Sequence, residues 1–69
     1  MKRVEIEMPE PAFYTGEEFE CEKTGIKLCK FTPIEKYKNR YDCQYSLFDG
    51  NRNYDLQEGV FNIIKNLMI

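Results

Sequence analysis

The stretch EEFECEKTGIKLCKF, residues 17–31, decides the fold. Residues 17–22 and 26–31 are strand-like runs, and Lys23-Thr24-Gly25 between them has the composition of a tight turn. The stretch therefore predicts a β-hairpin.

Two registers of this hairpin remain open. With a three-residue loop, Phe19 pairs with Cys29 and Cys21 with Lys27, so both cysteines share a face. With a loop of even length, Cys21 pairs with Leu28, and the cysteines point to opposite faces.

Turn chemistry and side-chain burial favour different registers. Because Thr24 is β-branched and resists positive φ, it favours the three-residue loop with its glycine in the left-handed position. The even loop costs about 1 kcal/mol of turn strain, but it buries two more aliphatic side chains for roughly 3–6 kcal/mol. That loop gathers one apolar face, which consists of Phe19, Cys21, Ile26 and Leu28. We therefore favour it.

Further strands are predicted on both sides of the hairpin. RVEIEM, residues 3–8, alternates apolar and polar positions and ends at the prolines of residues 9–11. Residues 12–17 read as a connection with Gly16 as its turn residue. YDCQYSLF, residues 41–48, alternates again, and DGNRN, residues 49–53, is typical of a turn.

Two stretches carry helix-start signals. Thr32, Pro33 and Glu35 match a capping box, so residues 32–39 are either a short helix or a connection. Asp55 and Glu58 match the same pattern ahead of a helical stripe. The stripe consists of Leu56, Val60, Ile63, Ile64 and Leu67, widened by Phe61 and Met68.

These elements predict one α+β domain over residues 1–69, with a small antiparallel sheet of three or four strands and a C-terminal helix packed on one face. The chain is 42% hydrophobic and 32% charged, which is typical of a globular protein. It contains neither an apolar run of about 18 residues nor the apolar region of a signal peptide. We therefore expect a cytoplasmic protein without a membrane partner.

The three cysteines occur without any histidine, at spacings Cys-x₇-Cys-x₁₃-Cys that do not suit a structural zinc site. We expect free thiols, with Cys21 and Cys43 as small core residues and Cys29 less buried. The sequence contains no phosphate-binding glycine loop and no catalytic triad pattern. We therefore expect no enzyme activity, no metal and no cofactor.

Charge is segregated along the chain. Residues 1–22 carry seven glutamates and two basic residues, a sum of −5, whereas residues 23–40 carry six basic residues and one glutamate, a sum of +5. We expect these blocks to face one another across the sheet or to form two faces for a partner.

KYKNRY, residues 36–41, is the strongest candidate for binding, because cations alternate with tyrosines. Such a patch suits nucleic acid, through phosphate pairing and base stacking, and it equally suits a protein interface. Its candidate residues are Lys36, Tyr37, Lys38 and Arg40, joined by Arg52 and Tyr54 from the following loop.

Phe31 and Phe48 are predicted on the sheet face away from the helix, where they would form an exposed apolar patch for a protein partner or a second copy of the chain. Together these features predict a small protein-interaction module, an inhibitor or modulator of a host protein. The bias toward Lys, Asn and Ile is typical of an AT-rich genome, and an AT-rich genome is compatible with a phage gene. The alternative is a nucleic-acid-binding module that uses residues 36–41, although the sequence pI of about 5.1 argues against general nucleic-acid affinity.

Overall fold

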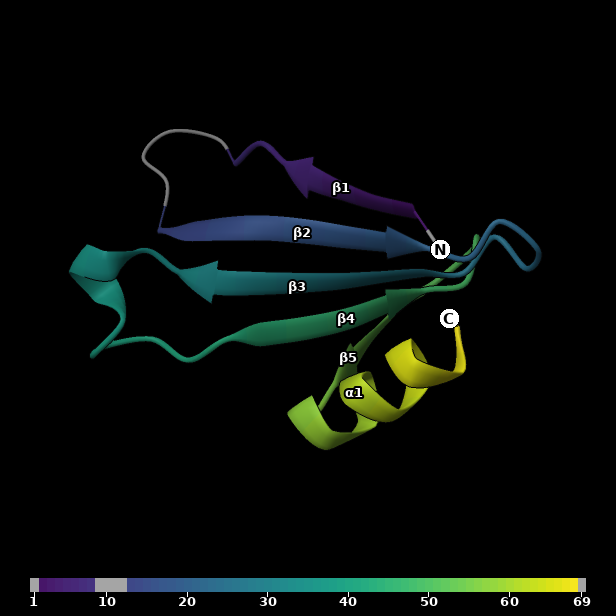
Figure 1. Cartoon of the computed structure of the whole chain (residues 1–69). Helices are drawn as coiled ribbons and strands as arrows, with labels where there is room; N and C mark the ends of the chain where they lie inside the picture. Colours follow the sequence, from purple (N-terminus) through teal and green to yellow (C-terminus); the bar gives the residue numbers. More distant parts are fainter. Residues whose placement is uncertain (1, 9–12, 69) are drawn as a thin grey trace.

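The computed structural model describes residues 2–8 and 13–68. One antiparallel sheet with strand order β1-β2-β3-β4-β5 precedes a single α-helix (Figure 1). The elements are β1 (Lys2–Ile6), β2 (Tyr14–Glu20), β3 (Lys27–Pro33), a short 3₁₀ helix η1 (Glu35–Tyr37), β4 (Gln44–Phe48), β5 (Asn53–Leu56) and α1 (Glu58–Leu67). The α+β class is confirmed, but the sheet has five strands and not the three or four predicted.

The central hairpin has a loop of even length. Phe19 lies opposite Leu28, and the Cys21 N–H donates to the Ile26 carbonyl at 2.9 Å, which leaves the four residues 22–25 as the loop. The prediction that the two cysteines point to opposite faces is confirmed, whereas the pair of Cys21 with Leu28 is wrong by two positions. In this four-residue loop Gly25 adopts a positive φ of 75°, and Thr24 keeps a negative φ without backbone strain.

Gly16 is not a turn residue, because it lies buried within β2. A β-carbon there would lie 3.0 Å from Cβ of Ile6 and 3.2 Å from Cε1 of Phe31. The glycine therefore lets these two side chains pack over the strand from both sides. Strand β1 ends at Ile6, two residues before the predicted end at Met8, and the prolines of residues 9–11 lie outside the described residues.

Neither predicted capping box forms. Asp55 belongs to β5, where it lies opposite Ser46, and α1 begins at Glu58 after Gln57, whose side chain makes no cap hydrogen bond. Thr32 continues β3 opposite Thr15, and only the one-turn helix η1 follows. In both places ladder pairing has overridden a local helix-start pattern.

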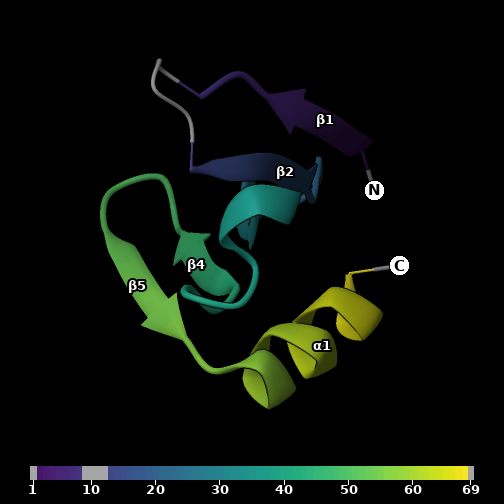
Figure 2. The ribbon, with the colours of Figure 1, turned by 90° about the vertical axis from the view of Figure 1, so that its left-hand side faces the viewer.

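The core lies between one sheet face and α1, which sits below β4 and β5 in Figures 1 and 2. Three side chains are buried there: Phe19, Leu28 and Phe61, at 5%, 0% and 1% exposure. They are flanked by the partly buried Tyr45, Leu47, Leu56, Ile64 and Met68. The Phe61 ring lies 4.8 Å from the ring of Tyr45 and 6.2 Å from that of Phe19.

Leu56, predicted as the first member of the helical stripe, belongs to β5, and the remaining members divide into two parts. Ile64 and Met68 pack on the core with Phe61, whereas Val60, Ile63 and Leu67 are exposed. No helix in the described ranges is long and apolar enough to cross a membrane.

The predicted facing of the two charge blocks is confirmed. Glu17 lies opposite Lys30, and Glu20 lies between Lys27 on one side and Lys2 on the other. The two blocks thus meet across the β2–β3 ladder, where opposite charges facing one another stabilise the pairing, whereas Glu5 lies opposite Glu17 across β1–β2.

Candidate interaction surface

The connection between β3 and β4 builds an aromatic surface at one end of the sheet. After Pro33 the chain folds into successive turns, in which the Tyr37 N–H donates to the Ile34 carbonyl at 2.8 Å and the Tyr41 N–H to the Tyr37 carbonyl at 3.1 Å. The Ile34 N–H donates to the Phe13 carbonyl at 3.0 Å, which fastens this connection to the start of β2.

Four rings meet there, and we call them the aromatic end cluster: Phe13, Tyr14, Tyr37 and Tyr41. The Phe13 ring lies 5.0 Å from Tyr37 and 6.2 Å from Tyr41, and Tyr41 lies 6.0 Å from Tyr14. Phe13 and Tyr41 are 40% and 42% exposed. Tyr14 and Tyr37 are half-buried and contact these exposed rings. The cluster is thus a braced surface rather than a set of separate side chains.

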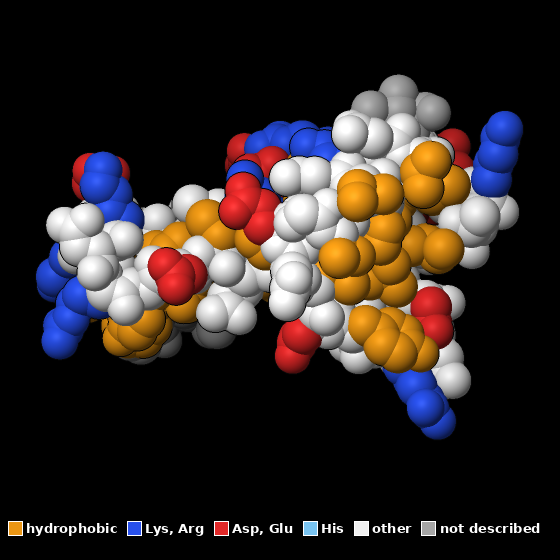
Figure 3. Space-filling view, turned by 90° about the horizontal axis from the view of Figure 1, so that it is seen from below, with side chains coloured by type: hydrophobic (Ala, Val, Ile, Leu, Met, Phe, Trp, Pro, Cys, Tyr) orange, Lys and Arg blue, Asp and Glu red, His pale blue; other side chains and the backbone are white. Residues whose placement is uncertain are grey.

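One cation contacts this cluster, and two more lie beside it in the chain. The Lys36 ammonium lies 5.5 Å from the centre of the Tyr37 ring, a cation–π contact, and the Lys38 ammonium pairs with Glu35 at 2.9 Å. Arg40 is exposed and makes no ion pair within the described ranges. In Figure 3 basic side chains appear at the left-hand end, which carries this connection, and also at the middle and the right of the view.

Residues 36–41 therefore lie together as predicted, but Arg52 and Tyr54 do not join them. These two belong to the β4–β5 turn and to β5, at the other end of β4. There the Asp49 carboxylate accepts hydrogen bonds from the N–H groups of Asn51 at 2.8 Å and Arg52 at 2.7 Å, and the Tyr54 hydroxyl donates to it at 3.3 Å. The two backbone donors, that of Arg52 first, hold the pKa of Asp49 below its usual value.

Sequence reasoning missed Phe13 and Tyr14, because it placed them in a connection. Only the pairing of β2 with β3 indicates their role in this surface. Tyr14 lies opposite Pro33, so Phe13 and Tyr14 lie at the end of the sheet where residues 34–41 begin.

Phe31 and Phe48 lie on the sheet face away from α1, as predicted, and each is half-buried. They do not form one continuous patch. Phe48 lies opposite Lys27, four residues along β3 from Phe31, so the two are about 13 Å apart at roughly 3.3 Å per residue, with Cys29 between them.

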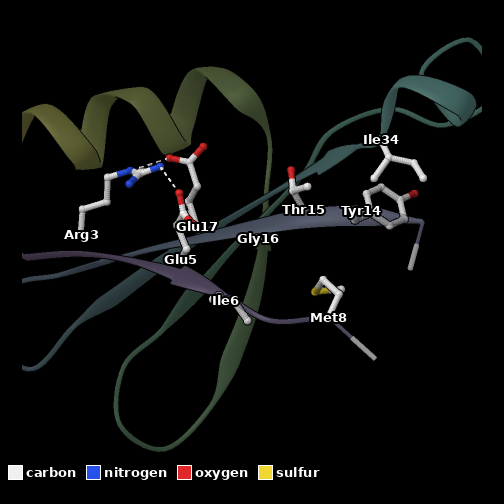
Figure 4. A pocket seen from close by; sticks show the side chains of 9 residues that line it. All are labelled: Arg3, Glu5, Ile6, Met8, Tyr14, Thr15, Gly16, Glu17 and Ile34. Atoms are coloured by element: carbon white, nitrogen blue, oxygen red, sulfur yellow. Dashed lines mark hydrogen bonds and ion pairs between the residues drawn. The ribbon is translucent and has the colours of Figure 1, made fainter. Parts of the chain in front are cut away.

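A shallow hollow of about 430 Å³ lies at the β1–β2 edge of the sheet. Figure 4 shows Arg3, Glu5 and Glu17 on one side of the strands, where Arg3 pairs with Glu17 at 3.0 Å and with Glu5 at 3.8 Å. Ile6 and Met8 lie on the other side. It lacks the enclosure with which small-molecule sites surround a ligand.

The three cysteines are free thiols, and each is half-buried, so the expectation that Cys21 and Cys43 belong to the buried core is wrong. A hydrogen bond from the Thr24 side chain lowers the pKa of Cys21, whereas burial raises the pKa of Cys29. Within residues 2–8 and 13–68, no group of three or more Cys, Asp or Glu side chains is placed to hold a metal ion.

Comparison of the chain with protein-family models, with curated proteins and with solved structures finds no match.

Proposed function

We propose that this chain is a small, non-enzymatic, intracellular protein-interaction module that binds a host protein as an inhibitor or modulator, through the aromatic end cluster. The observation that carries the proposal is a pair of exposed rings, Phe13 and Tyr41, which contact Tyr14 and Tyr37, with the Lys36 ammonium over the Tyr37 ring.

Braced aromatic side chains suit a binding surface, because little conformational entropy is lost when a partner covers them. A fully buried aromatic side chain contributes about 150–250 Å², so the exposed fractions of Phe13 and Tyr41 amount to roughly 160 Å² together. At about 25 cal/mol per Å², covering both gives a burial term of ~4 kcal/mol, of which only the part left after the costs of association appears as affinity. That is the scale of a binding hot spot.

The charges around the cluster favour a protein partner with an acidic rim. Lys36 already lies over the Tyr37 ring and Lys38 already pairs with Glu35, which leaves Arg40 as the exposed cation best suited to a carboxylate. Base stacking needs a free ring face, and the Tyr37 ring already contacts Phe13, Tyr41 and Lys36. The packing therefore removes Tyr37 as a stacking platform, whereas Phe13 and Tyr41 stay exposed to either kind of partner. The sequence pI of about 5.1 supports a protein partner over a nucleic acid.

The test is a pull-down from a lysate of the source cell, with and without nuclease, analysed by mass spectrometry. We compare the wild type with Tyr41→Ser and with the control Tyr54→Ser, because Tyr54 has nearly the same exposure, 45%, at the other end of the sheet. The proposal expects one stoichiometric protein that survives nuclease, is lost with Tyr41→Ser and is kept with Tyr54→Ser.

Loss of every partner after nuclease treatment would overturn the proposal in favour of nucleic acid. In that case binding would weaken steeply with salt, because phosphate contacts release counterions. If Tyr41→Ser and Tyr54→Ser both still capture the partner protein, the binding surface lies elsewhere on the chain.

A further inference from the structure

The outer side of α1 carries an apolar ridge that nothing in the described chain covers. Val60, Ile63 and Leu67 are 43%, 63% and 80% exposed, and we call them the outer stripe. At 100° per residue they lie within about 60° of one another around the helix. Figure 3, seen from below with α1 nearest, shows hydrophobic side chains gathered over the helix.

The border of the outer stripe on the solvent side is uncharged. Gly59 and Asn66 lie there, both exposed, and Asn62 lies beyond them, about 100° around the helix from Ile63. The two charged residues of α1 point elsewhere around the helix, and Lys65 lies over the Phe19 ring on the packed side, 4.3 Å from its centre. A partner on this ridge is therefore selected by shape and apolar contact rather than by charge.

We propose that the outer stripe binds the outer stripe of a second copy of this chain, with the two α1 helices antiparallel. A twofold interface requires a surface complementary to itself. The spacing 60, 63, 67 is nearly symmetric about the middle of α1, so an antiparallel pair places Ile63 against Ile63 of the partner subunit. Val60 then meets Leu67 of the other copy at both ends.

Charge and helix dipoles agree with this pairing. In a twofold contact every charge near the axis meets its own copy, so an uncharged border avoids like-charge repulsion. Antiparallel helices also place the positive end of each helix dipole beside the negative end of the other.

The available area suits a weak dimer. A standard interface buries about 800 Å² per partner, roughly 15% of the 5391 Å² surface of the described chain. A helix of ten residues is only about 15 Å long, so α1 alone supplies less. The ridge continues at Leu67 into a hollow of about 600 Å³, whose apolar lining of Ile26, Ile64 and Met68 extends the contact. The 22–25 loop also lines this hollow, so the extended contact includes the charged Glu22 and Lys23 at its outer end. We therefore expect a weak dimer that dissociates at micromolar concentration.

The dimer and the proposed function use different surfaces. The aromatic end cluster contains no residue of α1, so it stays accessible in the dimer, which would present two copies of it to a partner. Failure of one proposal therefore leaves the other standing.

The test is sedimentation velocity on the whole chain, from about 1 µM to about 1 mM, for the wild type, Ile63→Lys and Asn62→Lys. Asn62→Lys adds the same charge on the same helix outside the stripe, so it serves as the matched control. We expect a concentration-dependent dimer for the wild type and the control, and at least a tenfold weaker dimer for Ile63→Lys. Leu67→Lys, at the most exposed position, should act in the same way.

Circular dichroism at low concentration confirms that each variant is folded. A wild type that stays monomeric at about 1 mM would overturn the proposal, and so would a dimer that Ile63→Lys and Leu67→Lys leave unchanged. The wild type could also be monomeric and capture another protein that Ile63→Lys no longer binds. That result would assign the outer stripe to a different partner and would overturn the proposed dimer.

Discussion

Replacing Phe61 with alanine should remove most of the stability of this domain. The Phe61 side chain is 1% exposed and packs between the rings of Phe19 and Tyr45, so its deletion leaves a cavity under α1. Phe→Ala changes in cores cost about 3–5 kcal/mol. A chain of 69 residues has roughly 3–10 kcal/mol of total stability, at about 0.05–0.15 kcal/mol per residue.

The assay is urea unfolding followed by circular dichroism at about 1 µM protein, where the proposed dimer is dissociated. Ile63→Ala is the matched control on the same helix, and because Ile63 is 63% exposed it should change the free energy of unfolding by no more than about 0.5 kcal/mol. A cost below about 1 kcal/mol for Phe61→Ala, or equal costs for the two variants, would refute the assignment of the core-facing side of α1.

Three further outcomes follow from local geometry. Gly16→Ala should destabilise the fold by about 1–3 kcal/mol, because the new methyl group meets Ile6, and hydrogen exchange should show the loss first in β1; unchanged β1 protection would contradict this packing. The Asp49 carboxylate has a depressed pKa in the folded state, so its stabilising effect is present above its unfolded pKa of about 3.9 and is lost as pH falls through the folded value. Asp49→Asn should therefore lower the melting temperature at pH 7 and lose that difference in acid, whereas a pH-independent difference would rule out the ionic contribution. Cys21, with a lowered pKa, should be alkylated by iodoacetamide at pH 8 faster than Cys29, with its raised pKa, in a peptide map of the folded protein; the reverse order would contradict the hairpin geometry.

Local patterns predicted the hairpin faces and the C-terminal helix, and they failed where distant pairing decides the structure. Asp55 and Glu58 match a capping box, yet Asp55 is held in β5 by its position opposite Ser46. A strand of four residues that begins with Asn and contains Asp has little intrinsic β-propensity, so only the neighbouring β4 reveals it. Gly16 was wrongly predicted as a turn residue for the same reason, because its role depends on contacts with Ile6 and Phe31 from two other strands.

The candidate surface was only partly readable from the sequence. Residues 36–41 are close in the chain, so their grouping needs no tertiary information. The contact of Phe13 with Tyr37 depends on the pairing of β2 with β3, and the separation of Tyr54 from Tyr41 depends on the direction of β4. The stripe on α1 was predicted as one face, and only the position of the sheet shows that Val60, Ile63 and Leu67 stay uncovered.

The most direct test of the proposed interaction surface is a titration of the ¹⁵N-labelled chain with the captured protein, followed by ¹H–¹⁵N NMR. The account predicts that shift changes and line broadening centre on Phe13, Tyr14 and residues 35–41, while Arg52 and Tyr54 at the far end of the sheet stay unperturbed. Changes centred on the β4–β5 turn, or on the sheet face of Phe31 and Phe48, with residues 35–41 unaffected, would contradict it.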